Sequence, residues 1–435
     1  MKSARQITAE ALLRVERSQS WSNLTLDSAV HAGTLDARDE AFVGALFYGV
    51  LERLITLDTC IAAHARQKPA DLTDTVRIIL RMTVYQLLYM DSVPDYAAVD
   101  EAVELARKMR AARAAGFINA VLRAFIKGGK RVPAPRLPLE KRLSIEFSVG
   151  QALIRLWLDS YGYDKTLEIL RASLGRPPVY IRTNTLKTTR DKLLAQLREE
   201  GVTAVADDML PECIVLSGQG ALGRLSSFMQ GLFHVQDKSS QLCCLALEAG
   251  PGMRVLDTCA APGGKSFTLA QIMEGRGELV SAELHEQRAA RMAEQAIVMW
   301  ANNMKVVHAD MGKEHPGLGK FDRVLCDVPC SGFGVIRRKP EIRYKDLEDF
   351  SHIANIQYKI LSAASQYCKE GARLIYSTCT LNPAENEAVA ARFLEEYKAF
   401  APAPLPDVLG GAPERTLTGE FGGDCFFMAA FERKI

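Results

Sequence analysis

Two cysteines in the C-terminal part of the chain each follow an apolar stretch and precede a turn. Cys330 stands in the sequence DVPCSG and Cys379 in YSTCT. A cysteine at the end of a strand, near a helix N-terminus, can have its pKa lowered toward thiolate and then act as a nucleophile. Pro329 fixes the backbone before Cys330, and Asn382-Pro383 after Cys379 is typical of a helix start. A cysteine that only packs in a core needs none of these neighbours, so we predict that both thiols face one crevice and are candidate nucleophiles.

A turn of small residues follows another predicted strand, in the sequence VLDTCAAPGGKS from Val255 to Ser266. A glycine turn that leads from a strand into a helix presents backbone N–H groups at the carboxyl edge of a parallel sheet, where such folds bind ligands. The turn matches neither the G-x-G-x-x-G of dinucleotide-binding folds nor the G-x-x-x-x-G-K-[ST] of a P-loop. It therefore indicates a nucleotide-like ligand of another kind, and a tight turn without any ligand is the alternative.

These residues need a sheet to bring them together, and the C-terminal part of the chain predicts one. Helical stretches separate strands that we place at residues 254–257, 278–283, 305–309, 321–327 and 373–377, with 425–431 as a last edge strand. This alternation indicates βαβ units and a mainly parallel sheet. Asp257, Glu283, Asp310 and Asp327 then line one edge, and Glu283 is placed to bind a ribose diol. Any one of these acids could be only a helix cap, but their recurrence at strand ends favours a shared ligand cleft.

The N-terminal part, residues 3–127, reads as helix throughout and predicts a helical bundle. Breaks are expected at Gly33, Pro69, Pro94 and Gly128-Gly129. No acidic residue lies between Glu104 and Glu140, a segment that holds nine basic residues: Arg107, Lys108, Arg110, Arg113, Arg123, Lys127, Lys130, Arg131 and Arg136. In a chain whose net charge is only +2, this excess favours contact with the phosphates of nucleic acid over a merely solvated helix face.

Length and composition indicate a multidomain soluble protein. The chain has 435 residues, and none of its apolar runs reaches the length needed to span a bilayer. Ten cysteines without an export signal suggest reduced thiols and a cytoplasmic location. None forms a C-x-x-C pair, so no metal site is expected. Five of them are expected to pack in cores: Cys60, Cys243, Cys244, Cys326 and Cys368.

Between the helical and the catalytic parts lies a small α+β region. Strand patterns at residues 179–187 and 213–216 flank a helix at 189–200, and 143–174 reads as helical. The domains predicted are a helical RNA-binding domain at 1–128, a proline-rich linker at 129–143, an intermediate α+β (RRM-like) domain at 144–240 and an α/β Rossmann-like catalytic domain at 241–435.

The motifs of the catalytic part resemble those of the RsmB/NOP2/NSUN family of RNA cytosine-5 methyltransferases. The residues that carry the resemblance are QDKSSQL from Gln236, VLDTCAAPGGKS, DVPCSGFGVIRRKPEIR from Asp327 and STCTLNPAENE from Ser377. In the N-terminal part YQLLY, VPDYAAVDEAVELAR and GFINAVLR resemble the NusB antitermination-factor fold, an RNA-binding module. Together the likenesses cover nearly the whole chain.

The resemblance implies an S-adenosylmethionine-dependent enzyme that forms 5-methylcytosine in 16S ribosomal RNA through a covalent adduct. It makes Cys379 the nucleophile toward carbon 6 of cytosine, and Cys330 the residue that assists release. Asp327 would bind the N3 or N4 edge of the base, with Lys265 in a supporting role. For the cofactor it implies the turn and three further residues besides Asp327: Cys259, Ala260, Ala261, Pro262, Gly263, Gly264, Lys265, Glu283, Arg288 and Asp310.

A target base must leave its helix to meet both a thiolate and a methyl donor, so we expect single-stranded or looped RNA. Basic residues after DVPCSG could bind the flanking phosphates: Arg337, Arg338, Lys339, Arg343 and Lys345. A monomer is the default expectation. The alternatives are a methyltransferase for another substrate class, which leaves the two cysteines unexplained, and a non-enzymatic RNA-binding factor, which leaves the aligned acids and thiols without purpose.

Overall fold

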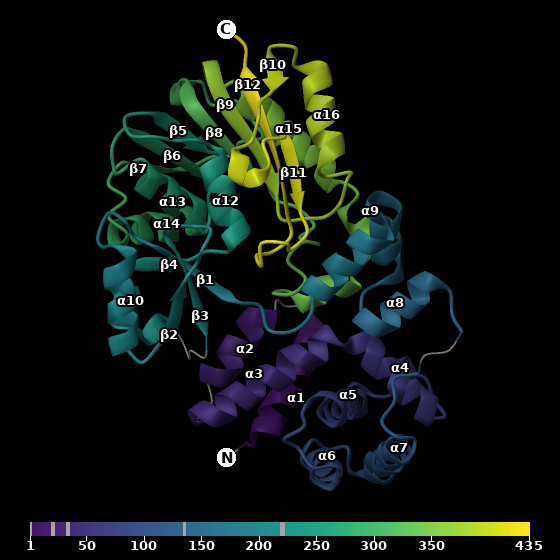
Figure 1. Ribbon diagram of the computed structural model, residues 1–435. Coiled ribbons are helices and arrows are strands. Elements are labelled where there is room, and N and C mark those ends of the chain that lie inside the picture. The colour runs from purple at the N-terminus through teal and green to yellow at the C-terminus, as the bar shows by residue number, and fades with distance from the viewer. Residues whose placement is uncertain (1, 19–21, 32–34, 134–135, 218–221) are drawn as a thin grey trace. The chain divides into compact units, whose positions relative to one another are not determined.

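The computed structural model describes residues 2–18, 22–31, 35–133, 136–217 and 222–435 (Figure 1). The chain forms two compact units. The first contains the residues up to Arg176 together with Ile336–Leu347, and the second contains Pro177–Val335 and Glu348–Ile435. Within the described ranges no helix is long and apolar enough to cross a membrane. The predicted break at Gly33 lies outside the described residues.

The first unit is helical, as predicted. Its α-helices are α1 (Ala4–Ser18), α2 (Ser22–His31), α3 (Ala37–Glu52), α4 (Leu54–His64), α5 (Asp74–Tyr89), α6 (Asp95–Lys108), α7 (Ala115–Lys127), α8 (Leu139–Phe147) and α9 (Gln151–Ala172). Pro94 directly precedes α6 and Gly128 ends α7, so two of the expected breaks mark helix ends. The long helical stretch expected at 143–174 is two helices, and α9 itself is kinked at Gly162, whose φ is +75°.

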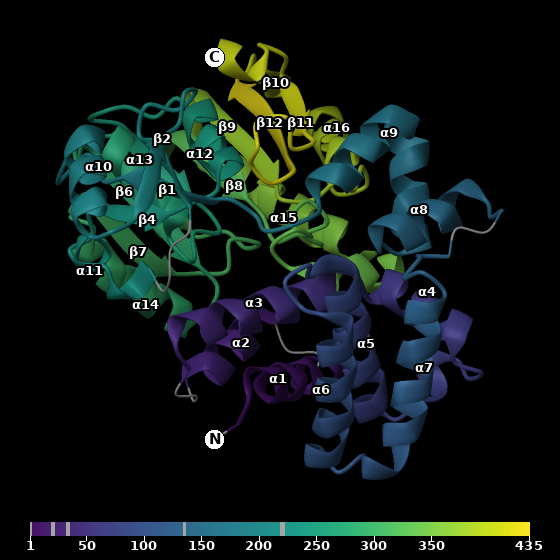
Figure 2. The same cartoon turned by 60° about the horizontal axis from the view of Figure 1, so that its bottom comes forward.

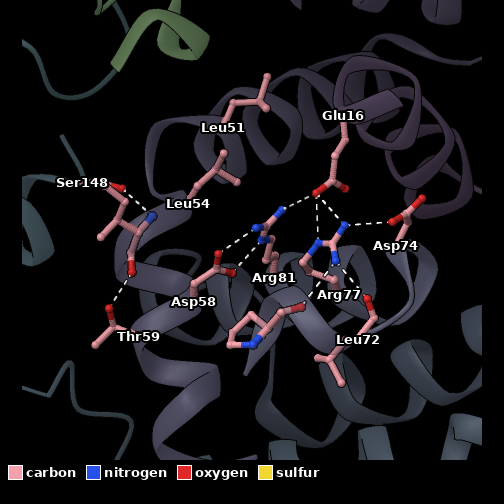
Figure 3. A network of polar contacts seen from close by, with 12 residues as sticks. Glu16, Leu51, Leu54, Asp58, Thr59, Leu72, Asp74, Arg77, Arg81 and Ser148 are labelled. Atoms are coloured by element: carbon pink, nitrogen blue, oxygen red, sulfur yellow. Dashed lines mark hydrogen bonds and ion pairs between the residues drawn. The ribbon is translucent and has the colours of Figure 1, made fainter. Parts of the chain in front are cut away.

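The core of the first unit is apolar, and α5, α6 and α7 lie side by side around it (Figure 2). Phe47, Ile79 and Leu122 are fully buried there. Arg81 of α5 is also nearly buried, and both oxygens of Asp58 accept from its guanidinium at 2.7 Å (Figure 3). Glu16 accepts from Arg81 as well, so two carboxylates compensate the charge of this nearly buried guanidinium.

The second unit begins with a small antiparallel sheet in the strand order β2-β3-β1-β4. Its elements are β1 (Val179–Thr183), α10 (Arg190–Glu199), β2 (Thr203–Ala206), β3 (Cys213–Ser217), α11 (Ser226–Met229) and β4 (Phe233–Val235). The sequence predicted β1, α10 and β3. It missed β2 and β4, which have only four and three residues and therefore show too little alternation to be recognised.

The main sheet of the second unit has eight strands, with the order β10-β12-β9-β8-β5-β6-β7 and β11 paired to β12. They are β5 (Arg254–Asp257), β6 (Glu278–Glu283), β7 (Met304–His308), β8 (Phe321–Asp327), β9 (Cys368–Thr378), β10 (Phe400–Pro402), β11 (Glu414–Leu417) and β12 (Phe426–Arg433). Strands β5 to β9 are parallel. The prediction of β12 as an edge strand is wrong, because it pairs antiparallel with β9 on one side and with β10 on the other.

Helices cover both faces of this sheet (Figure 1). They are α12 (Lys238–Ala246), α13 (Gly264–Ile272), α14 (Glu286–Val298), α15 (Ile353–Ser365) and α16 (Glu387–Glu396). Val255 packs in one apolar core with α12, α13 and α14, and its neighbour Leu256 packs in another with α15 and α16. Successive strand residues point to opposite faces, so a continuous apolar run such as Val255-Leu256 serves both cores.

Candidate active site

The parallel strands bring the predicted acids and cysteines to one edge of the main sheet. Asp257 pairs with Leu325 in β8, and Asp327 pairs with Ser377 in β9. Strands β8 and β9 therefore end within one residue of each other, and β5 ends two residues before β8. Cys379 follows β9 at once, and Cys330 lies three residues beyond β8. The sheet therefore supplies the edge that the sequence predicted.

The two cysteine sulfurs lie 3.3 Å apart, although 49 residues separate them in the chain. Both residues are partly exposed, unlike the five cysteines predicted to pack in cores, which are fully buried. The hydrogen bond to Cys379, together with burial and the Cys379 charge, raises the pKa of Cys330 well above its ordinary value. The expectation of a lowered pKa is therefore wrong for Cys330, which rests as a neutral thiol beside its partner.

Lys265 and Asp327 form an ion pair next to this edge. The Nζ atom of Lys265 lies 2.8 Å from Oδ2 of Asp327, whose Oδ1 accepts from the Ser377 hydroxyl at 2.9 Å. Burial lowers the pKa of Lys265, but the charge and hydrogen bond of Asp327, together with the nearby Cys243 and Cys244, more than offset this, so the net pKa is raised. Lys265 is thus a fixed cation that also donates to the Ser240 hydroxyl at 3.3 Å.

The turn between β5 and α13 has a tightly packed backbone. Gly263 has φ +108°, and a Cβ there would lie 2.6 Å from the ring of Phe267, so only glycine fits. Helix α13 begins at Gly264 without a side-chain cap, and its first N–H groups point into the turn region. Packing therefore requires glycine at position 263, whereas a Cβ at Gly264 would meet only Nε2 of Gln236 at 4.0 Å.

Asp257 is buried, unlike Asp310 and Asp327, which are partly exposed. It is only 1% exposed, and its Oδ2 accepts from the Ser266 hydroxyl at 2.7 Å. Burial raises the pKa of Asp257 to about 6. This carboxyl supports the turn through Ser266. Because Glu283, at 4% exposure, is buried as well, only Asp310 and Asp327 of the four acids predicted to line one cleft are partly exposed.

Glu283 and Arg288 form a unit that reaches the same turn. Arg288 lies 3.3 Å from Oε1 of Glu283 and donates to the carbonyl oxygen of Ala261 at 2.9 Å. Glu283 also accepts from the backbone N–H of His285 at 2.9 Å. Asp310 follows the neighbouring strand β7, is partly exposed, and accepts from the backbone N–H of Gly312 at 3.0 Å.

Part of the basic segment after the Cys330 loop makes contacts inside the protein. Residues 336–347 belong to the first unit, where Arg343 is fully buried and donates to Ser173 and to the carbonyl oxygen of Phe147. Arg337 donates to the carbonyl oxygens of Gly175 and Arg176. The prediction that Arg343 binds RNA phosphates is therefore wrong, because its buried guanidinium donates its hydrogen bonds to carbonyl oxygens of the protein.

Other polar residues that fasten the cysteine loops were missed by sequence reasoning. The hydroxyls of Ser331 and Thr380 lie 2.6 Å apart, and the N–H of Gly334 donates to the carbonyl oxygen of Cys379 at 3.0 Å. Glu385 accepts from the backbone N–H of Ser331 at 2.9 Å. The signal for Glu385 was its position inside STCTLNPAENE, but nothing in the sequence alone says that it faces the Cys330 loop.

Comparison with known families agrees with this architecture. Residues 244–432 match the family described as 16S rRNA methyltransferase RsmB/F, residues 2–127 match the NusB family, and residues 151–222 match the ferredoxin-like domain of RsmF/B-like methyltransferases. A probable ribosomal RNA small subunit methyltransferase B of Bacillus subtilis is 34% identical over 99% of both chains. The chain belongs to the RsmB/F family.

Further relatives extend the likeness of this RsmB/F family member. A ribosomal RNA small subunit methyltransferase B of Klebsiella pneumoniae is 31% identical over 98% of this chain and 97% of the relative. Among solved structures, PH0851 covers 100% of this chain and 99% of its own, with a TM-score of 0.83 and 23% identity. NSun6 from Pyrococcus horikoshii with SFG covers 65% of this chain and 97% of its own, with a TM-score of 0.59 and 22% identity. At these identities the two structures support the fold.

Proposed function

We propose that the protein transfers a methyl group from S-adenosylmethionine to carbon 5 of a cytosine in the RNA of the small ribosomal subunit. Family membership supports a methyltransferase that uses this donor and acts on ribosomal RNA. The observation that carries the assignment to carbon 5 of a pyrimidine is the pair of partly exposed sulfurs, 3.3 Å apart at the sheet edge; the choice of cytosine rests on the resemblance of the motifs. Methyl transfer to an oxygen or an amine needs no thiol nucleophile, whereas carbon 5 of a pyrimidine must first be activated.

The residues at the edge fit the donor molecule. The N–H groups at the uncapped start of α13 and the turn from Cys259 to Lys265 suit the carboxylate of its methionine part. Glu283 suits the ribose hydroxyls, with Arg288 holding both this carboxylate and the turn. Asp310, at the end of the next strand, suits the adenine amino group. When bound, S-adenosylmethionine supplies an electrophilic methyl group.

Cys379 is the proposed nucleophile, and its thiolate adds to carbon 6 of the base. This addition makes carbon 5 electron-rich and places negative charge toward N3. Asp327 is proposed to bind the N3 and N4 edge of the ring, and Lys265, 2.8 Å from Asp327, offsets the charge that collects there. Ser377 holds the second oxygen of Asp327, so the carboxyl keeps its direction during the reaction.

Cys330 is proposed to take the proton from carbon 5 and so to allow release of Cys379. Before the reaction the neighbouring sulfur helps to hold the Cys330 proton, since the hydrogen bond to Cys379 is the largest cause of the raised pKa. Once Cys379 is bonded to carbon 6 it no longer carries charge or accepts that hydrogen bond. The pKa of Cys330 then falls, and its thiolate becomes available as the base only after the adduct has formed.

The helical unit is proposed to bind the RNA near a single-stranded or looped target. Its expected basic residues are at the surface of the segment from α6 to α7, where Arg110, Arg113 and Arg123 are exposed. A positively charged surface of this kind binds phosphates without reading sequence. The protein is expected to work in the cytoplasm, since all ten cysteines are free thiols, which suits a reducing compartment.

Methyl transfer from labelled S-adenosylmethionine tests the proposal. Ribosomal RNA of the small subunit is incubated with the protein and digested to nucleosides, and the label should be found in 5-methylcytidine. Cys379→Ala should abolish the transfer while cofactor binding, followed by calorimetry, stays unchanged. Label in another nucleoside, or in protein, would contradict the proposal, as would full transfer by the Cys379→Ala variant.

A further inference from the structure

A buried carboxylate lies behind the two cysteines and contacts both of the loops that carry them. Glu385, at 1% exposure, is as buried as a core residue. Its Oε2 accepts from the backbone N–H of Ser331, next to Cys330, and its Oε1 accepts from the side-chain amide of Asn382, in the loop after Cys379, both at 2.9 Å. One acid therefore links the two loops directly.

Gln357 of α15 completes this arrangement. Its Nε2 donates to Oε2 of Glu385 at 2.9 Å and to the carbonyl oxygen of Pro329 at 2.9 Å. The hydroxyl of Tyr376 donates to the backbone carbonyl of Glu385. A buried carboxylate is costly unless its oxygens accept hydrogen bonds, and here both do so from groups of the cysteine loops and their support.

We propose that Glu385 is a positioning residue of the reaction: by binding the Cys330 loop and the Cys379 loop at once, its carboxylate sets the distance between the two sulfurs. The inference rests on the proposed function for its meaning, but the spacing itself can be measured without RNA or cofactor. Besides this link, the loops are joined by the Ser331–Thr380 contact, by the backbone bond from Gly334 to Cys379 and by the contact of the two sulfurs themselves. Two thiols that must act in turn on carbons 6 and 5 of one ring need a fixed separation.

The charge of Glu385 acts on Cys330 in the same direction as Cys379. The Cys379 hydrogen bond is the largest cause of the raised pKa of Cys330, followed by burial, the Cys379 charge and the Glu385 charge. The titratable groups that face this thiol are thus Cys379 and Glu385, and Tyr376 interacts with it from β9. Removing the carboxylate charge, or separating the sulfurs, should lower the pKa of Cys330.

The first experiment measures sulfur spacing through disulfide formation. An azo oxidant such as diamide takes the two thiol hydrogens onto its nitrogens, becomes a hydrazine, and leaves a bond between the two sulfurs. Sulfurs held 3.3 Å apart should be joined quickly in the wild type. Glu385→Gln should slow formation of the Cys330–Cys379 peptide pair at least about tenfold, because the introduced amide would face the donating amide of Asn382.

Glu387→Gln is the matched control, since it makes the same chemical change two residues away. Glu387 accepts from the hydroxyl of Thr416 in β11, not from a cysteine loop, so this variant should join its sulfurs at the wild-type rate. If Glu385→Gln does not fold, Asn382→Ala removes a single contact of the carboxylate and decides the matter. Disulfide formation at the wild-type rate in folded Glu385→Gln protein overturns the proposal. If Asn382→Ala has to be used instead, the wild-type rate in that variant overturns it.

The second experiment separates positioning from a general loss of structure. Alkylation of Cys330 by iodoacetamide is followed by peptide mapping across pH, and the rate rises as the thiol ionises. In Glu385→Gln this rise should move to lower pH, because a charge that holds the proton is gone. A change of rate by the same factor at every pH would mean a merely structural role and would overturn the proposal. Neither result depends on methyl transfer, so failure of the proposed function stays distinguishable.

Discussion

Replacing Asp257 by asparagine tests whether this carboxyl is a buried brace of the turn or a member of the ligand cleft. Asp257 is 1% exposed, and burial raises its pKa to about 6 from 3.8. The unfolded chain ionises at the lower value, so between these two values the folded state holds more protons. Stability therefore falls as the pH rises through this window and is level above it.

The size of the effect follows from the two pKa values. Ionisation of the buried carboxyl lowers the free energy of unfolding by about 3 kcal/mol at about pH 7.5 and by about 1.6 kcal/mol at about pH 5, a difference of about 1.4 kcal/mol. The asparagine side chain carries no charge at either pH, and any change in hydrogen bonding to Ser266 cancels in the comparison. As the pH rises from about 5 to about 7.5, the free energy of unfolding of Asp257→Asn should therefore increase by about 1.4 kcal/mol relative to that of the wild type. This corresponds to roughly 3–6 °C in melting temperature.

Tryptophan fluorescence can follow the second unit alone. The chain has three tryptophans, and Trp300 is the one in the second unit, so Trp21 and Trp157 are first replaced by phenylalanine. Thermal unfolding of this background protein is then compared with that of the same protein carrying Asp257→Asn, across the pH window. If the gap between the two melting temperatures does not change with pH, Asp257 is not the desolvated acid described above.

Three other changes test separate parts of the account. Gly334→Ala places a Cβ 2.2 Å from the carbonyl oxygen of Cys425 and 2.8 Å from that of Cys379, so methyl transfer should fall at least about tenfold. Gly317→Ala meets nothing within 4 Å and should leave it unchanged; equal rates for the two variants would contradict this. Arg343→Met leaves buried carbonyls without donors and should destabilise the first unit by about 1–3 kcal/mol in urea unfolding. Lys345→Met, at an exposed site, is its control, and equal stability of the two variants would contradict a stabilising role of Arg343 in the first unit. Changing Arg110, Arg113 and Arg123 together to glutamine should reduce the slope of log affinity for RNA against log salt by roughly 2–3, measured by filter binding; an unchanged slope would place the RNA elsewhere.

The sequence predicted the elements of the main sheet because their apolar runs and turns are strong local signals. Strands β6 and β8 begin and end as predicted, at Glu278–Glu283 and Phe321–Asp327. The edge that gathers Asp327, Cys330 and Cys379 followed from parallel pairing alone. What local patterns could not show was the inner position of β12, which was predicted as a strand but pairs on both sides with residues far away in sequence.

The chemical environment of the site was less predictable than its location. Asp257 and Glu283 are both acids at the ends of strands, yet they have different partners. Asp257 accepts from the Ser266 hydroxyl, while Glu283 pairs with Arg288, which also contacts the turn. The lowered pKa expected for Cys330 from its turn is reversed by a second sulfur at 3.3 Å. Arg343 lies in a basic stretch that resembles an RNA-binding loop, but it is buried against carbonyls of the first unit. Each of these outcomes depends on a partner remote in sequence.

The central claim is that Cys379 bonds to the base and Cys330 releases it, and mapping of the adduct tests this most directly. Cys330→Ala protein is incubated with small-subunit RNA and S-adenosylmethionine, denatured and digested with nuclease and protease. Mass spectrometry should then find a methylated cytidine on the peptide that contains Cys379. An adduct on a different residue, or repeated turnover by the Cys330→Ala protein with no adduct, would contradict the account.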